Sequence, residues 1–211
     1  MSIMEHQFAL LKEAANHLSA SDVAPYFKLK HLQHTQNGHD RSEFRQLFSR
    51  FYGLNAGGLT DDFKNRYFEL LFSLRLAPNL EPPYADLLKE LYEFRRRKGD
   101  QVLAVSFVSK LVSMHDESRP LYDRHVRNFF GIGKPALGSV IFQTEGFIHN
   151  LGIIRSQYEN WSADPNFETM INHLLKKIPQ LKDCHPNRVC DFLVWTAGRR
   201  KLGNSKSVDE V

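Results

Sequence analysis

Apolar residues recur along most of the chain at the spacing of an amphipathic helix, in which residues three and four positions apart share a face. Phe44, Leu47, Phe48 and Phe51 follow this spacing, and similar stripes begin near residues 63, 84 and 167. No stretch between turn signals shows the sustained two-residue alternation of a half-buried strand. The pattern predicts an all-α protein, a compact bundle of about nine or ten helices.

Turn residues divide this pattern into individual helices. The helix that begins after the proline pair at 82–83 is expected to end in the basic run 95–98 before Gly99, because cations and a left-handed glycine favour a helix C-terminus. A buried helix is predicted over 101–114, a short one over 123–130 and a long one reaching about residue 160. Pro186 is expected to start a last helix over 187–198.

Domain organisation is less strongly marked. The chain of 211 residues is long enough for one domain or for two small helical lobes. The proline-rich segment 78–83 is the best candidate boundary, and it would separate an N-terminal helical lobe (1–80) from a C-terminal helical lobe (81–211). A single domain is the alternative.

Composition adds an aromatic core and a mild positive charge. Sixteen Phe, seven Tyr and two Trp residues predict a core built largely from rings, and a net charge of +4 is compatible with a polyanionic partner. Two cysteines form no disulfide framework, and the N-terminus lacks the pattern of a signal peptide. No stretch has 18 consecutive apolar residues, so we expect no membrane span and a cytoplasmic location.

Lys110 is the most informative residue, because it interrupts the apolar helix predicted over 101–114. Removing an ammonium group from water is costly. The lysine therefore either extends its amine to the surface or lies where a lowered pKa leaves a neutral, nucleophilic amine. Thirteen residues later, Asp123 opens the next predicted helix, where it is expected to cap the helix N-terminus or to serve as a functional carboxylate.

The strip from Ser106 to His125 carries Lys110 on a helix, Pro120 in a turn and Asp123 at the next helix start. This strip resembles the active-site strip of helix-hairpin-helix DNA glycosylases, in particular the lysine-bearing 8-oxoguanine type and its short bacterial relatives. The segment 189–195 is similar to the final helix of those relatives. The resemblance covers mainly residues 101–130 and 187–198.

The resemblance implies base excision in DNA repair, with hydrolase and lyase activity on an oxidised purine. In that family the lysine attacks the sugar carbon and the aspartate assists, which are the roles implied for Lys110 and Asp123. A histidine two residues after the aspartate contacts the substrate strand, which points to His125. A flipped-out base also requires stacking aromatic rings; the candidates are Phe130, Phe192 and Trp195.

Two further groups are candidates for contacts with the DNA backbone. The first is the basic run of Arg95, Arg96 and Arg97, which either binds phosphates or only complements a helix C-terminus. The second is the turn of Gly131, Gly133 and Lys134, which either caps a helix or binds phosphate.

No cofactor or metal is expected. The sequence lacks a P-loop, a dinucleotide fingerprint and a His-Glu-x-x-His motif, and Cys184, His185 and Cys190 offer three metal ligands without a fourth nearby. The leading hypothesis is thus a DNA-binding base-excision enzyme. The alternatives are a non-catalytic helical module that binds DNA or a protein, and a helical scaffold with no nucleic-acid partner.

Overall fold

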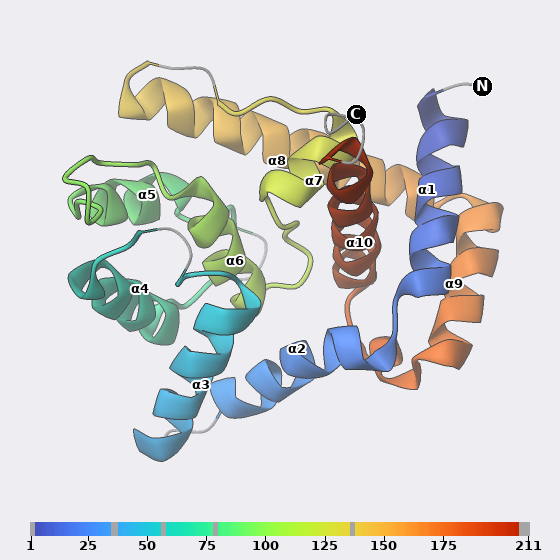
Figure 1. Cartoon of the computed structure of the whole chain (residues 1–211), viewed down its shortest axis with the longest axis horizontal. Helices are drawn as coiled ribbons and strands as arrows, with labels where there is room; N and C mark the ends of the chain where they lie inside the picture. The colour runs from blue at the N-terminus through green and yellow to red at the C-terminus, as the bar shows by residue number, and fades with distance from the viewer. Residues whose placement is uncertain (1–2, 35–37, 56–57, 78–79, 136–137, 207–211) are drawn as a thin grey trace. The chain divides into compact units, whose positions relative to one another are not determined.

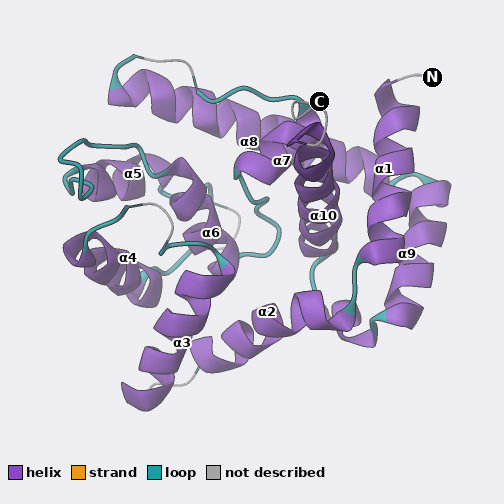
Figure 2. Ribbon diagram, in the orientation of Figure 1, coloured by secondary structure: helices purple, strands orange, loops and turns teal. Residues whose placement is uncertain are grey.

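The computed structural model describes residues 3–34, 38–55, 58–77, 80–135 and 138–206. These residues form an all-α fold, which confirms the predicted fold class (Figures 1 and 2). In chain order, the described part contains α1 (Ile3–His17), α2 (Ala20–Gln33), α3 (Gly38–Phe51), α4 (Asp61–Ser73), α5 (Tyr84–Tyr92), α6 (Val105–His115), α7 (Arg124–Phe130), α8 (Val140–Ser162), α9 (Pro165–Lys177), a 3-10 helix, η1 (Pro179–Asp183), and α10 (Pro186–Lys206).

The chain divides into two compact units. Unit 1 comprises residues 1–20, 117–136 and 146–211, and unit 2 comprises residues 21–116 and 137–145. These divisions differ from the 1–80 and 81–211 lobes suggested by the sequence, where Pro78 and Asn79 lie outside the described residues. Among the described residues, no helix combines the length and apolar character needed to cross a membrane.

Aromatic rings form the core of unit 2, as the composition predicted. Phe48 on α3 lies 5.7 Å from Tyr67 and 5.7 Å from Phe68 on α4, measured between ring centroids. Tyr67 lies 6.3 Å from Phe107 on α6, and its hydroxyl donates a hydrogen bond to the Phe107 carbonyl at 2.9 Å. Each such ring pair contributes about 0.5–1.5 kcal/mol beyond the burial of its area. The rings therefore fix α3, α4 and α6 against one another.

The C-terminus of α6 is held by side chains from elsewhere in unit 2. Lys30 donates to the Met114 carbonyl at 3.3 Å, and His115 Nε2 donates to the Leu71 carbonyl at 2.7 Å. Burial lowers the pKa of His115, which keeps its ring neutral near pH 7. These bonds satisfy a carbonyl of the last turn of α6 and tie that end of the helix to α2 and α4.

Unit 1 joins both ends of the described chain. Helices α9 and α10 both contact α1, and α10 also packs against α7 (Figure 1). The Lys177 amine donates to the carbonyls of Ala15 and Asn16 at 3.2 and 2.6 Å. Trp161 on α8 stacks on Phe130 at 5.7 Å and on Phe167 at 5.9 Å, so unit 1 has an aromatic cluster of its own.

Three predicted helix boundaries are wrong. Helix α5 ends at Tyr92 rather than in the basic run, because Arg96 forms an isolated β-bridge with Leu59 and the Arg97 amide donates to the Gly58 carbonyl at 2.9 Å. Helix α6 begins at Val105 rather than at residue 101. Helix α10 continues past residue 198 to Lys206.

Candidate functional site

Lys110 lies inside unit 2 and not at its surface. The residue is 6% exposed, and its amine donates to the Tyr52 carbonyl at 3.3 Å and to the Ser106 hydroxyl at 3.1 Å. Ser106 precedes Lys110 by one helical turn, so the two side chains share a face of α6. The amine also lies 5.8 Å from the Tyr52 ring and 5.4 Å from the Phe107 ring. Of the two alternatives that the sequence left open for Lys110, extension of its amine to the surface is therefore wrong.

The surroundings of Lys110 explain how an amine is tolerated there. Lys110 is itself 6% exposed and its neighbours on α6, Val108, Leu111 and Val112, are fully buried, so little water reaches this side chain. A carbonyl oxygen, a hydroxyl oxygen and two ring faces take the place of that water, because each attracts a positive or hydrogen-bond-donating group. The site therefore consists of a desolvated amine with polar partners on one side and aromatic rings around it.

Asp123 caps the N-terminus of α7, as the sequence predicted. Its Oδ1 accepts hydrogen bonds from the amides of His125 at 2.8 Å and Val126 at 3.1 Å. Its backbone is extended, with φ −133° and ψ −173°, which is the usual conformation of an N-cap residue. The side chain is 8% exposed, so the carboxylate is held by the helix rather than by solvent.

A buried polar network around Asp191 on α10 contacts the segment that precedes Asp123. The Asp191 carboxylate accepts hydrogen bonds from the Leu121 amide at 3.0 Å and from the Tyr158 hydroxyl at 2.9 Å, and it pairs with Arg188 at 2.9 Å. Arg188 and Asp191 are each 1% exposed. Burial raises the pKa of Asp191 to about 6, although all three partners favour its charged form.

Helices α7 and α10 approach each other at backbone distance. A β-carbon on Gly198 would lie 2.1 Å from the His125 carbonyl oxygen. Only glycine therefore permits this separation of the two helices. The contact places the first turn of α7, which Asp123 caps, directly on α10.

His125 and Trp195 lie together at this helix pair. Their ring centroids are 5.4 Å apart in an edge-to-face arrangement, and both residues are half-buried. The exposed Arg199 places its guanidinium 5.0 Å from the Trp195 ring. Phe192, also on α10, is half-buried. Aromatic faces beside cations are a common surface for nucleotides.

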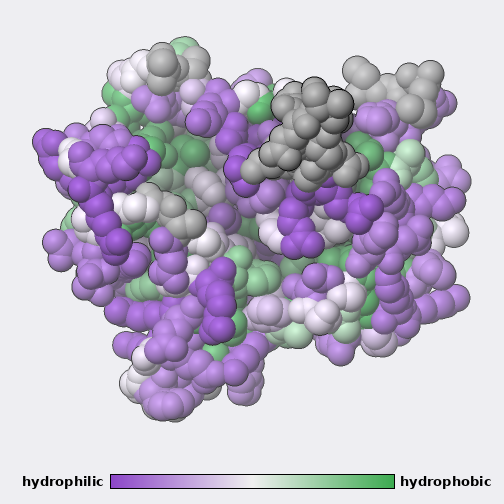
Figure 3. Space-filling view, in the orientation of Figure 1, coloured by the Kyte–Doolittle hydropathy of each residue, from purple (hydrophilic) through white to green (hydrophobic). Residues whose placement is uncertain are grey.

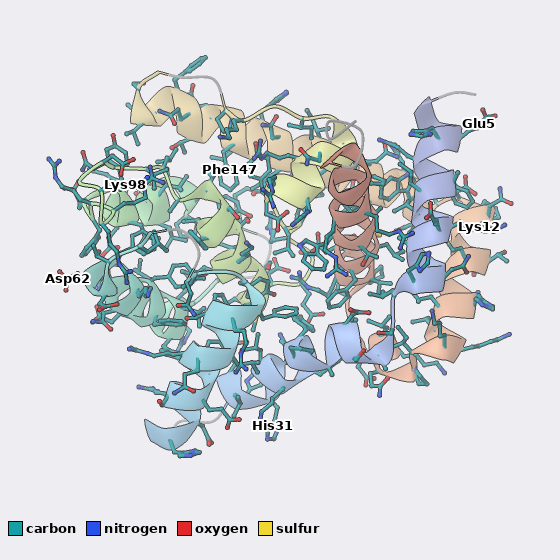
Figure 4. The ribbon with its side chains drawn as sticks, in the orientation of Figure 1. Glu5, Lys12, His31, Asp62, Lys98 and Phe147 are labelled. Atoms are coloured by element: carbon teal, nitrogen blue, oxygen red, sulfur yellow. The ribbon has the colours of Figure 1, made fainter. Side chains whose placement is uncertain are left out.

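The basic run lies on a loop of unit 2 rather than on a helix. Arg95 and Arg97 are exposed, whereas Arg96 pairs with Asp100, which raises the pKa of the arginine and lowers that of the aspartate. Lys98, labelled in Figure 4, belongs to the same loop, and the surface there is strongly hydrophilic (Figure 3). The loop thus presents cations to solvent, although Arg96 is paired with Asp100 and Arg95 donates to the Gly99 carbonyl at 2.7 Å.

The turn after α7 caps the C-terminus of that helix, which is one of the two interpretations drawn from the sequence. Gly131 adopts a left-handed conformation with φ +66°, and the next amide, that of Ile132, donates to the Arg127 carbonyl at 2.9 Å. This geometry confirms the helix C-cap interpretation. Gly133 accepts a hydrogen bond from the Tyr122 hydroxyl at 3.2 Å, and Lys134 is exposed. Phosphate binding by this turn stays a prediction.

The ligand atoms of Cys184, His185 and Cys190 are not brought together. His185 Nδ1 accepts a hydrogen bond from the Asn187 amide, and burial raises the pKa of the Cys190 thiol. In the described part of the chain, three potential ligand groups come within 4.8 Å of one another only at His39, Asp40 and Glu43 on α3. Glu43 there pairs with Lys28.

The predicted site residues fall into two sets. Unit 1 brings Asp123, His125, Phe192, Trp195 and the 131–134 turn onto α7, α10 and their connections, and unit 2 holds Lys110 and the basic loop.

Sequence reasoning missed several partners of these residues. A serine one helical turn before a buried lysine is a readable signal for Ser106, and a lone aspartate in the apolar run 189–195 is one for Asp191. Nothing local to the sequence indicates the Tyr52 carbonyl, which lies 58 residues from Lys110.

Comparison of the chain with protein-family models, with curated proteins and with solved structures gives no match.

Proposed function

We propose that this chain is a DNA-binding protein that excises an oxidised purine and cleaves the strand, with Lys110 as the nucleophile. The observation that carries the proposal is the desolvated Lys110 amine, held by Tyr52 and Ser106 among aromatic rings. Placing a lysine in a hydrophobic environment is one way in which proteins generate a reactive amine.

The chemistry is nucleophilic displacement followed by elimination. The neutral amine forms a bond to sugar C1′, and the glycosidic bond to the base breaks, so the base leaves with the bonding electrons and takes up a proton. The C1′–O4′ bond then opens: O4′ keeps the bonding electrons and takes up a proton to become a hydroxyl, and a protonated imine remains between Nζ and C1′. Loss of a C2′ proton expels the 3′ phosphate and cleaves the strand. Borohydride reduces the imine to a stable secondary amine.

Asp123 is the carboxylate in this proposal. Positive charge develops on the sugar as the base departs, and a negative charge nearby lowers the energy of that state. The two amide hydrogen bonds from His125 and Val126 fix the orientation of the carboxylate before substrate arrives. Preorganisation of this kind avoids reorganisation during the reaction.

The remaining candidates supply contacts with the nucleic acid. His125, Phe192 and Trp195 are proposed to contact the flipped-out nucleotide, and Arg199 joins this group because it lies over Trp195. The phosphate backbone is proposed to meet Arg95, Arg96 and Arg97, with Gly131, Gly133 and Lys134 as a second contact. A base must leave the duplex before its glycosidic bond is accessible, which is why both kinds of contact are needed.

Borohydride trapping tests the proposal directly. The protein is incubated with a duplex carrying one 8-oxoguanine, borohydride is added, and the covalent protein–DNA adduct is resolved by denaturing electrophoresis. We expect an adduct with the wild-type chain, none with Lys110→Gln, and a strongly reduced amount with Asp123→Asn. Lys89→Gln, which changes an exposed lysine on α5, is the matched control and should retain the adduct. Absence of wild-type adduct across a panel of oxidised purines would contradict the enzymatic proposal.

One observation favours the second candidate, a non-catalytic helical module that binds DNA or a protein. The Lys110 amine already donates to a carbonyl and a hydroxyl within its own unit, which would satisfy a structural lysine. This candidate predicts DNA binding without adduct. It further predicts that Lys110→Gln leaves DNA affinity unchanged, because the residue would then serve only packing.

A further inference from the structure

The segment between α6 and α7, residues 117–122, contains no helix and ends at Asp123. The chain around the start of α10 holds this segment at successive points. The His185 amide donates to Glu117 Oε2 at 2.9 Å, the Asn187 side-chain amide donates to the Ser118 carbonyl at 2.7 Å, and Asp191 accepts from the Leu121 amide. All of these groups belong to unit 1, so the arrangement lies within one compact body.

Among these contacts, the hydrogen bond of Asp191 bears most directly on the position of Asp123. Its bond to the Leu121 amide is the one nearest to Asp123, two residues away, and it is fully buried from solvent. Beyond Asp123, the close contact of Gly198 with the His125 carbonyl holds the first turn of α7. The Asp123 carboxylate is therefore fixed from both sides by residues of α10.

We infer that Asp191 is a positioning residue, which holds the Leu121 backbone and through it sets the place and orientation of the Asp123 carboxylate. The inference rests on the proposed function for the chemistry of Asp123, but its structural content does not depend on that chemistry. A carboxylate suits this task because each of its oxygens accepts hydrogen bonds at defined angles, whereas apolar packing specifies orientation less sharply.

The composition of this network indicates that it orients the backbone and does not only stabilise the fold. A buried ion pair is weak support for stability, since well-packed apolar residues of similar volume often replace it without loss. Arg188 and Asp191 lie one turn apart on α10 and are almost fully buried, so burial alone would be served by two leucines. What leucines cannot supply is an acceptor for the Leu121 amide.

Hydrogen exchange of single amides tests this inference without any assay of activity. The amides of Leu121, His125 and Val126 are followed by NMR in the wild-type chain and in the double variant Arg188→Leu/Asp191→Leu, which removes both charges together so that neither is left buried alone. We expect exchange of these three amides to accelerate about tenfold or more in the double variant, because a bond to a charged acceptor is lost. Exchange in α9, which carries none of the network residues, should stay within twofold.

Tyr158→Phe is the matched control. It removes one donor to Asp191 and leaves the Leu121 bond in place, so we expect the three amides to remain protected. If Tyr158→Phe accelerated them as strongly as the double variant, the network as a whole and not Asp191 would hold the segment, and the inference would be wrong. Unchanged exchange in the double variant would overturn it equally.

A pH titration adds a measurement that a packing role would not move. The groups that face Asp191 are Arg188 and Cys190 on α10, Tyr158 on α8 and Asp123 at the start of α7. Burial raises the pKa of Asp191 to about 6, so the Leu121 amide shift should titrate near pH 6 in the wild-type chain, and at a higher pH in Tyr158→Phe, which loses a hydrogen bond that favours the charged carboxylate. The double variant should show no such step.

Borohydride trapping then connects the position of Asp123 with its proposed role. In the double variant we expect the rate of adduct formation to fall about tenfold or more, with DNA affinity within twofold of wild type. If the wild-type chain forms no adduct, the proposed function fails, while the exchange measurements still decide whether Asp191 is a positioning residue. If adduct forms equally fast in the double variant, the Asp191 contact does not serve the reaction.

Discussion

Replacing Lys110 by methionine tests whether the lysine is needed for the proposed reaction or for the stability of the fold. Methionine has a similar length and fills irregular apolar space readily. The substitution removes the amine and with it the hydrogen bonds to Tyr52 and Ser106. Both the stability of the chain and its ability to form an adduct can then be measured on the same sample.

The expected change in stability follows from two opposing contributions. Keeping a neutral amine away from water costs about 1–3 kcal/mol, and methionine removes that cost. Against it stand the two hydrogen bonds of the amine, at about 0.5–1.5 kcal/mol each. The contributions nearly cancel, so we expect the free energy of unfolding to change by less than about 2 kcal/mol. For a chain of this size that corresponds to less than about 8 °C in Tm.

Urea denaturation followed by far-ultraviolet circular dichroism measures this difference. Leu111→Ala, one position along α6 and fully buried, provides the scale, because truncating a buried leucine typically costs about 2–5 kcal/mol. Near-neutral stability together with complete loss of adduct would identify a residue kept for chemistry. A loss as large as that of Leu111→Ala would refute the reasoning and make Lys110 a structural residue.

Three other predictions follow from the structure. Gly198→Ala should destabilise the chain by about 3 kcal/mol or more in urea denaturation, because the new β-carbon would overlap the His125 carbonyl. Gly152→Ala, whose β-carbon would meet nothing within 4 Å, should instead stabilise α8 by about 0.5–1 kcal/mol. The pKa of Asp191 is raised from 3.8 to about 6 in the folded chain, so protonated Asp191 favours folding. The free energy of unfolding is therefore expected to be highest below pH 3.8 and to fall by about 3 kcal/mol as the pH rises through 6. Asp191→Asn should flatten this part of the stability–pH curve measured by urea denaturation. In the double variant Arg95→Ser/Arg97→Ser, the slope of the logarithm of the DNA-binding constant against the logarithm of the salt concentration should become shallower by about 2. An unchanged slope would show that the loop does not contact DNA phosphates.

Local signals in the sequence were sufficient for much of the fold. The 3.6-residue spacing located α3, α4 and α9, and Asp123 and Gly131 marked the two ends of α7, because capping depends on residues within one turn. The basic run was placed wrongly on a helix, since its conformation depends on Gly58 and Leu59, nearly forty residues earlier in the chain.

The candidate site was predictable only in part for the same reason. Lys110 stood out among apolar neighbours, but whether its amine turns inward depends on the Tyr52 carbonyl from another helix end. Asp191 was visible as an aspartate in an apolar run, yet its partner is a backbone amide that no side-chain pattern reveals. Tertiary contacts decide both, and periodicity carries no information about them.

The joining of both chain ends in unit 1 has a consequence for the order of synthesis. Helix α1 is made first among the described helices, yet Leu11 and Ala14 on it are fully buried in a unit whose other helices are made last. Lys177, which binds the end of α1, follows it by 162 residues, which is roughly 8–30 s of translation. Residues 21–116, by contrast, form most of unit 2 as one continuous segment. On the ribosome, we therefore expect residues 21–116 of unit 2 to fold early, while the apolar face of α1 stays unpacked until α9 and α10 have been made.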